Sequence, residues 1–194
     1  MDWKNPGDIG AIVYHCGFCG EKVSSSKGYY SKGSVRMIYI CPNCTCPTYI
    51  DKIGEMLKQY PGVAYGNKVE YVPENINALY EEARNCMSIQ AYTTSVMASR
   101  KLLMNIAVEK GADEGLSFMN YVEYLDSKHY IPPDGKEWVD HIRQKGNEAN
   151  HEIIIMEKED AEELINFIEM LLKIIYEFPG KMKQKKESSQ TNHS

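Results

Sequence analysis

Four cysteines near the N-terminus have the spacing of metal ligands. Cys16 and Cys19 form one Cys-x-x-Cys element, and Cys41 and Cys44 form a second about twenty residues later. A gap of two residues lets both thiolates of an element face one tetrahedral ion, and two such elements at this separation are typical of a zinc ribbon. The sequence therefore predicts a structural zinc ion held by these four thiolates. Because four thiolates leave no ligand position for water, catalysis at the metal is not expected.

Three other uses of these cysteines remain open from the sequence. Cys46 is a spare thiol that could replace Cys44 as the fourth ligand, although its longer gap from Cys41 suits a tight turn less well. Disulfides are the second alternative, and they are rare in a reducing cytosol. The third is a thioredoxin-like redox pair, which needs one Cys-x-x-Cys in a βαβ setting rather than two among hairpins.

A second group of chemically active side chains lies in the stretch IRQKGNEANH, residues 142–151. On a helix, Arg143, Asn147 and His151 follow one another at intervals of four residues. Asn150 lies almost above Arg143, two turns further on. One stripe would then present a guanidinium, two carboxamides and an imidazole. Such a set can bind an anion, or act on a phosphodiester with the histidine as acid or base. The alternative is a buried polar latch, satisfied by a carboxylate and backbone carbonyls at a helix crossing.

The elements that must position the cysteines form a small β-rich module over residues 1–60. Short runs rich in β-branched and aromatic residues are separated by turn residues, and they occupy positions 11–15, 28–30, 35–40 and 48–50. Each Cys-x-x-Cys element follows the end of such a run. Because the module is too small to build a large core, a bound metal would supply much of its stability.

After a linker over residues 61–72, the hydrophobic pattern becomes helical. It predicts five helices, at 74–88, 91–110, 117–128, from 134 or 135 onwards, and 158–177. Ser117 is the expected N-cap of the third helix, and the wide apolar face of the last predicts a core helix of a bundle. The polar, lysine-rich residues 181–194 predict a disordered tail. The expected fold class is therefore α+β, with a helical bundle over residues 73–180.

The charge distribution limits the ligands that the chain can bind. The net charge of −5 argues against a broad basic surface for nucleic acid. The first 60 residues carry seven basic and five acidic side chains, a net charge of +2, which leaves −7 for the rest. A local contact with RNA is therefore expected on the ribbon rather than on the bundle. No apolar run reaches the roughly 20 residues that span a bilayer and no signal peptide opens the chain, so we expect a cytoplasmic protein without membrane contact.

Two stretches of the chain resemble the bacterial domain-of-unknown-function family 4145. The first is ARNCMSIQAYTTSVMASRKLLMNIAVEKG, and the second, some forty residues on, is IRQKGNEANHE. The family's pattern is a helix with an arginine near its middle, here Arg100, and then Arg-x-x-Gly-Asn-x-x-x-His, here Arg143 to His151. The resemblance covers about residues 73–178. The family in turn resembles the HEPN superfamily of helical bundles, several of which are metal-independent ribonucleases in toxin and antiphage systems.

The resemblance implies two alternative functions. The first is a binding or regulatory module in bacterial or phage defence, in which the ribbon contacts RNA or a protein and Arg100 and Asn150 help to bind an anionic ligand. The second is a metal-independent endoribonuclease, with Arg143 and His151 as the catalytic pair and Asn147 as a polar assistant. Both imply a homodimer, because HEPN sites commonly form where two motif helices meet. Seven residues separate Arg143 from His151, a wider gap than is usual in HEPN nucleases, and this favours the module.

Overall fold

The chain divides into two compact units. The structure is a computed structural model, and it describes residues 3–33, 36–53, 56–133, 138 and 155–191. The first unit comprises Met1–Tyr65 with Asn85–Ala91, and we call it the sheet unit; the second comprises Gly66–Arg84 with Tyr92–Ser194, and we call it the helical unit. An antiparallel sheet followed by helices confirms the expected α+β class.

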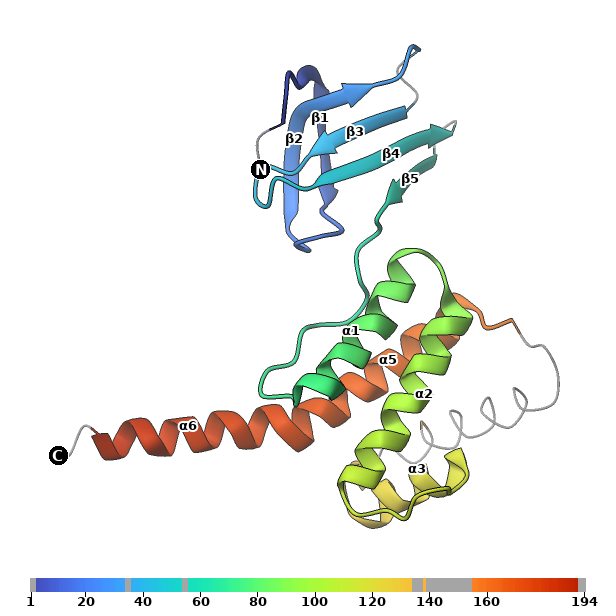
Figure 1. The fold of residues 1–194 in the computed structure, drawn as a ribbon, viewed down its shortest axis with the longest axis vertical. Coiled ribbons are helices and arrows are strands. Elements are labelled where there is room, and N and C mark those ends of the chain that lie inside the picture. The colour runs from blue at the N-terminus through green and yellow to red at the C-terminus, as the bar shows by residue number, and fades with distance from the viewer. Residues whose placement is uncertain (1–2, 34–35, 54–55, 134–137, 139–154, 192–194) are drawn as a thin grey trace. The chain divides into compact units, whose positions relative to one another are not determined.

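The sheet unit is built on five antiparallel strands that neighbour one another in chain order (Figure 1). They are β1 (Gly7–His15), β2 (Lys22–Tyr30), β3 (Arg36–Ile40), β4 (Pro47–Ile53) and β5 (Met56–Tyr60). The four predicted runs fall on the first four strands, but β5 was not predicted. Its sequence MLKQY has only a weak β pattern, and its place is set by pairing with β4 from Tyr49–Tyr60 to Ile53–Met56.

One face of the sheet carries the core of this unit. Side chains alternate between the two faces of a strand, so every second residue points inward. The buried set on this face consists of Tyr14, Val23, Tyr39 and Ile50, packed together with Cys16 and Cys41. Two of the predicted metal ligands are therefore part of the core itself.

Four helices of the helical unit were predicted to within about two residues at each end, except for the C-terminal end of the last. They are α1 (Glu74–Ser88), α2 (Tyr92–Glu109), α3 (Phe118–Ser127) and α5 (Lys158–Leu172). Ser117 caps α3 as predicted, because its side chain accepts a hydrogen bond from the Asn120 N–H. The predicted helix from residue 134 or 135 lies outside the described residues except for Trp138, whose ring meets Phe167 edge-on at 5.2 Å. In the described part of the chain, no helix is long and apolar enough to cross a membrane.

The prediction of a disordered tail over residues 181–194 was wrong for residues 181–191, which form a helix. Helix α5 continues through a π-helical turn, η2 (Lys173–Glu177), into α6 (Phe178–Thr191), and Figure 1 shows them as one continuous run. A proline followed by a glycine, as at Pro179-Gly180, ordinarily favours the end of a helix. Proline has no N–H to donate within a helix, and a π turn next to it changes the local bonding so that the Phe178 N–H reaches the Lys173 carbonyl.

An extended segment over residues 66–71, which we call the strap, lies along this long helix. The backbone N–H of Glu70 donates to the Glu177 carboxylate at 3.2 Å, and Lys181 bridges Glu70 and Glu177. Tyr71 packs so closely on Gly180 that a Cβ there would lie 2.4 Å from the Tyr71 ring. The partners are more than 100 residues apart in the sequence, so local patterns cannot reveal them. They explain why so polar a segment is helical.

Candidate metal centre

The structure brings the four predicted cysteine ligands together. The sulfurs of Cys16, Cys19, Cys41 and Cys44 all lie within 4.8 Å of one another. The Cys16–Cys44 separation is 3.7 Å and the Cys19–Cys41 separation is 3.9 Å. A tetrahedral ion with metal–sulfur bonds of about 2.3 Å requires sulfurs about 3.8 Å apart. These four sulfurs therefore fit the corners of one tetrahedral site.

Both Cys-x-x-Cys elements fold into the same turn. The same backbone hydrogen bonds close them, namely Gly20 N–H to Cys16 O (2.8 Å), Cys16 N–H to Glu21 O (2.9 Å), Thr45 N–H to Cys41 O (2.9 Å) and Cys41 N–H to Cys46 O (3.0 Å). The residue after the second cysteine is left-handed in each turn, with φ of 76° at Gly20 and 60° at Thr45. Glycine adopts this conformation freely, whereas threonine adopts it at a cost in free energy. The hydrogen bonds of the second turn therefore hold Thr45 in a conformation that its side chain disfavours.

Backbone N–H groups point at the four sulfurs in the same pattern in both turns. The first cysteine of each pair accepts from the residues two and three positions ahead, and the second accepts from the residue two positions ahead. The Asn43 side chain adds a further donor, 3.6 Å from the Cys19 sulfur. Donors directed at sulfur stabilise the thiolate, which is the form that binds metal.

The alternative in which Cys46 replaces Cys44 is not realised. The thiol of Cys46 lies outside the group of four, and its backbone N–H donates to the Cys44 sulfur instead. Cys46 thus supports a candidate ligand and is not itself one of the group of four. None of the six cysteines forms a disulfide, so the disulfide alternative is not realised either.

The four thiols differ in their protonation before metal binds. Burial raises the pKa of Cys16 and of Cys41, and it raises the pKa of Cys44 to about 11. Burial also acts on Cys19, but hydrogen bonds from the Glu21 N–H and the Asn43 side chain outweigh it and lower the pKa to about 7. Three of the four thiols therefore keep their protons at neutral pH in the absence of metal. Because metal binding must release these protons, the affinity for metal should rise with pH.

The remaining predicted site residues belong to the helical region of the chain. Arg100 lies on α2, where its half-buried guanidinium stacks over the Phe118 ring of α3 at 4.3 Å. Burial lowers its pKa. This stacking joins the two helices. The other predicted residues, Arg143, Asn147, Asn150 and His151, lie outside the described residues.

The sequence prediction missed the supporting residues of the centre. Thr45 takes the left-handed position of the second turn, and Asn43 supplies a side-chain donor. The signal was present in the positional equivalence of the two elements, because Thr45 follows Cys44 as Gly20 follows Cys19. This equivalence is hard to recognise in the sequence, because the residue after the second cysteine is a glycine only in the first turn.

A model of the family described as "Domain of unknown function (DUF4145)" matches residues 81–189. The match covers more than half of the chain, from within α1 to near the end of α6. The chain belongs to this family. The DUF4145 match extends beyond residue 180, so most of α6 belongs to the family domain and is not an appended tail. No curated protein and no solved structure matches the chain.

Proposed function

We propose that this DUF4145 protein is a non-enzymatic binding or regulatory module whose sheet unit is a zinc ribbon. The observation that carries the proposal is the group of four sulfurs at tetrahedral separations, with N–H donors directed at each. Two of the four ligand side chains, Cys16 and Cys41, are fully buried in the core. A structural ion there would join the two turns and fold the unit.

The donor set favours zinc in a structural role. Four thiolates in a tetrahedral arrangement are typical of structural zinc and of iron–sulfur sites. The ligands saturate the ion, so it can neither bind a substrate nor activate a water molecule. The chemistry of the centre therefore supports a scaffold that presents its surface to a partner.

Metal analysis of protein purified without added zinc tests the proposal. We expect one zinc per chain, because the four ligands are preassembled around a single position. The Cys44→Ser variant should lose the metal, and Cys46→Ser should retain it, because Cys46 contributes only its backbone N–H. Wild-type protein that is folded without metal, or that carries iron in place of zinc, would contradict the proposal.

For the helical unit we propose a homodimer and a role in bacterial or phage defence. Both rest on the resemblance of the family to HEPN domains. In such a dimer, Arg100 and Asn150 would help to bind an anionic ligand, and RNA or a protein would be the partner of the ribbon.

The second candidate is the metal-independent endoribonuclease, favoured by the clustering of Arg143, Asn147 and His151 in the sequence. The histidine would act as acid or base, and the arginine would stabilise the developing charge. Under the module proposal, we expect wild-type protein to leave single-stranded RNA intact. If His151 belongs to a buried polar latch, His151→Ala should lower the free energy of unfolding by about 1–3 kcal/mol, because its partner would lose a hydrogen bond. An RNA assay in chelator and a urea titration measure the two quantities. Cleavage that is abolished by His151→Ala without loss of stability would instead establish the nuclease.

A further inference from the structure

The face of the sheet opposite the core carries a row of large side chains. Residues directly opposite one another on paired strands project from the same face. Tyr29 on β2 pairs with Ile38 on β3, Ile38 pairs with Tyr49 on β4, and Tyr49 pairs with Tyr60 on β5. The neighbouring positions Tyr39 and Ile50 belong to the core. These four residues, which we call the outer row, therefore cross four strands on the outer face.

The outer row is accessible to a ligand. Ile38 is 37% exposed and Tyr60 is 43% exposed, whereas Tyr29 and Tyr49 are half-buried. The solvated face of an antiparallel sheet normally carries polar side chains. A row of three tyrosines and an isoleucine departs from that pattern without serving the core of the unit, and such a surface marks an interaction site.

The aromatic rings of this face are arranged next to one another. Tyr49 and Tyr60 have ring centroids 6.2 Å apart. At the other end of the row, Trp3 lies 6.3 Å from the Tyr29 ring, and its indole N–H is fixed by the Thr45 carbonyl at 2.7 Å. The planes of the two ring pairs are tilted by 40° and 54°, so each pair offers a ring face to a separate base. Aromatic rings on one face of a sheet are a platform on which two or three bases can stack.

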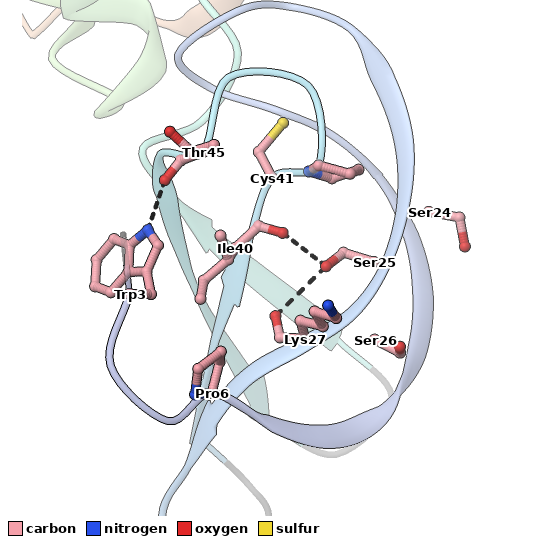
Figure 2. A pocket seen from close by; sticks show the side chains of 10 residues that line it. Trp3, Pro6, Ser24, Ser25, Ser26, Lys27, Ile40, Cys41 and Thr45 are labelled. Atoms are coloured by element: carbon pink, nitrogen blue, oxygen red, sulfur yellow. Dashed lines mark hydrogen bonds between the residues drawn. The ribbon is translucent and has the colours of Figure 1, made fainter. Parts of the chain in front are cut away.

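A hollow of about 620 Å³ adjoins the Trp3 end of the row. Figure 2 shows Trp3 and Thr45 on one side of it and the serines of β2 on the other, with Ile40 between them. Lys27 also lines the hollow. Its lining therefore combines one aromatic ring with hydroxyl groups and a cation, and these can contact a base and a phosphate.

Cations flank the outer row. Arg36 lies two residues before Ile38, and Lys58 lies two residues before Tyr60, so both project from the outer face. Asp51 and Asp8 are acidic residues of this face: Asp51 pairs with Arg36 at 3.9 Å, and Asp8 on β1 lies opposite Lys27. With Lys27 at the hollow, three cations accompany these two carboxylates, a net charge of +1. The charge of the face is therefore complementary to a phosphate backbone.

We propose that the outer face binds single-stranded nucleic acid, with bases stacked on the outer row and Trp3 and with phosphates beside Lys27, Arg36 and Lys58. Stacking on aromatic rings requires unpaired bases, so a duplex should bind less well. The proposal deepens the function proposed above and rests on it, because the zinc-folded sheet is what holds the row in place.

Fluorescence anisotropy with zinc-loaded full-length protein and a short labelled single-stranded RNA of mixed sequence tests the inference. We expect binding that weakens as salt rises and that is weaker for the corresponding duplex. Replacing both Tyr49 and Tyr60 by leucine keeps the apolar area but removes the rings, and it should lower the affinity on the order of tenfold or more. Tyr30→Leu is the matched control. Tyr30 is 61% exposed, but it pairs with Met37 on the core side of the sheet. The affinity of the Tyr30→Leu variant for RNA should therefore not change.

Zinc content and thermal melts of the same samples distinguish the outcomes. Zinc-loaded wild-type protein that binds neither the RNA nor a DNA strand of the same sequence overturns this inference and leaves the zinc proposal intact. Protein without zinc overturns the proposed function instead. Equal losses in the double variant and in Tyr30→Leu also overturn the inference. So does a double variant that loses self-association rather than nucleic-acid binding, because the face would then bury a second copy of the chain.

Discussion

Removing the metal is expected to unfold the sheet unit and to leave the helical unit folded. Two of the four sulfurs, those of Cys16 and Cys41, are buried in the core of the sheet unit. Without a metal ion, this small core would have to bury thiol groups that no ion holds together. Structural zinc with thiolate ligands contributes on the order of 10 kcal/mol to folding. The core of the helical unit, as far as the structure describes it, is formed mainly by α1, α2, α3 and α5 and contains none of the four cysteines. Cys19→Ser should have the same effect as a chelator.

One tryptophan in each unit makes this prediction measurable. Trp3 belongs to the sheet unit, and Trp138 packs on Phe167 in the helical unit. In a Trp138→Phe background, the Trp3 emission should shift to that of a solvated indole when a chelator is added. In a Trp3→Phe background, the Trp138 emission should not change. Cys46→Ser is the matched control and should behave as wild type; an unshifted Trp3 signal in metal-free protein would contradict the prediction.

Glu169→Ala is expected to destabilise the helical unit by about 1–3 kcal/mol, because it leaves part-buried hydrogen-bond donors without their acceptor. The Glu169 side chain is 10% exposed, and its carboxylate accepts hydrogen bonds from the Asn67 backbone N–H at 2.7 Å and from the Asn67 side chain at 3.0 Å. It also pairs with Lys173. It is thus the main attachment of the strap to α5.

Urea denaturation followed by Trp138 fluorescence measures the loss. Glu162→Ala is the matched control on the same helix, because Glu162 forms a surface pair with Lys158, whose side chain is 57% exposed. Its removal should cost less than about 1 kcal/mol. Equal and small losses in the two variants would show that the strap is not held by Glu169.

The same carboxylate predicts a loss of stability in acid. Burial raises the pKa of Glu169, but hydrogen bonds from Lys173 and from Asn67 outweigh it and hold the pKa below its ordinary value. A group whose pKa is lowered by folding stabilises the native state above its unfolded pKa, which is about 4.3 for glutamate, and this stabilisation is lost as the pH falls through the folded pKa. The acid transition should be shallower in Glu169→Gln. Part of the acid transition should remain in this variant, because hydrogen bonds from Lys181 and from the Glu70 N–H also lower the pKa of Glu177.

The sequence by itself determined the features that depend on local spacing. The two Cys-x-x-Cys elements favoured Cys16, Cys19, Cys41 and Cys44 as the thiols that meet, because a two-residue gap has few ways to fold around one ion. Hydrophobic periodicity located α1, α2, α3 and α5, and the hydroxyl of Ser117 identified a helix start. These signals act within a few residues of the chain, so they can be read without a fold.

The tertiary structure alone decided what depends on distant partners. It selected Cys44 over Cys46 by directing the Cys46 N–H at the Cys44 sulfur, and it added β5 through pairing with β4. It made α6 a helix, because the strap places Tyr71 and Glu70 against it from more than 100 residues away. It also aligned the outer row, which is scattered along four strands in the sequence. Strand register and long-range hydrogen bonds bring such groups together, and a local pattern carries no information about either.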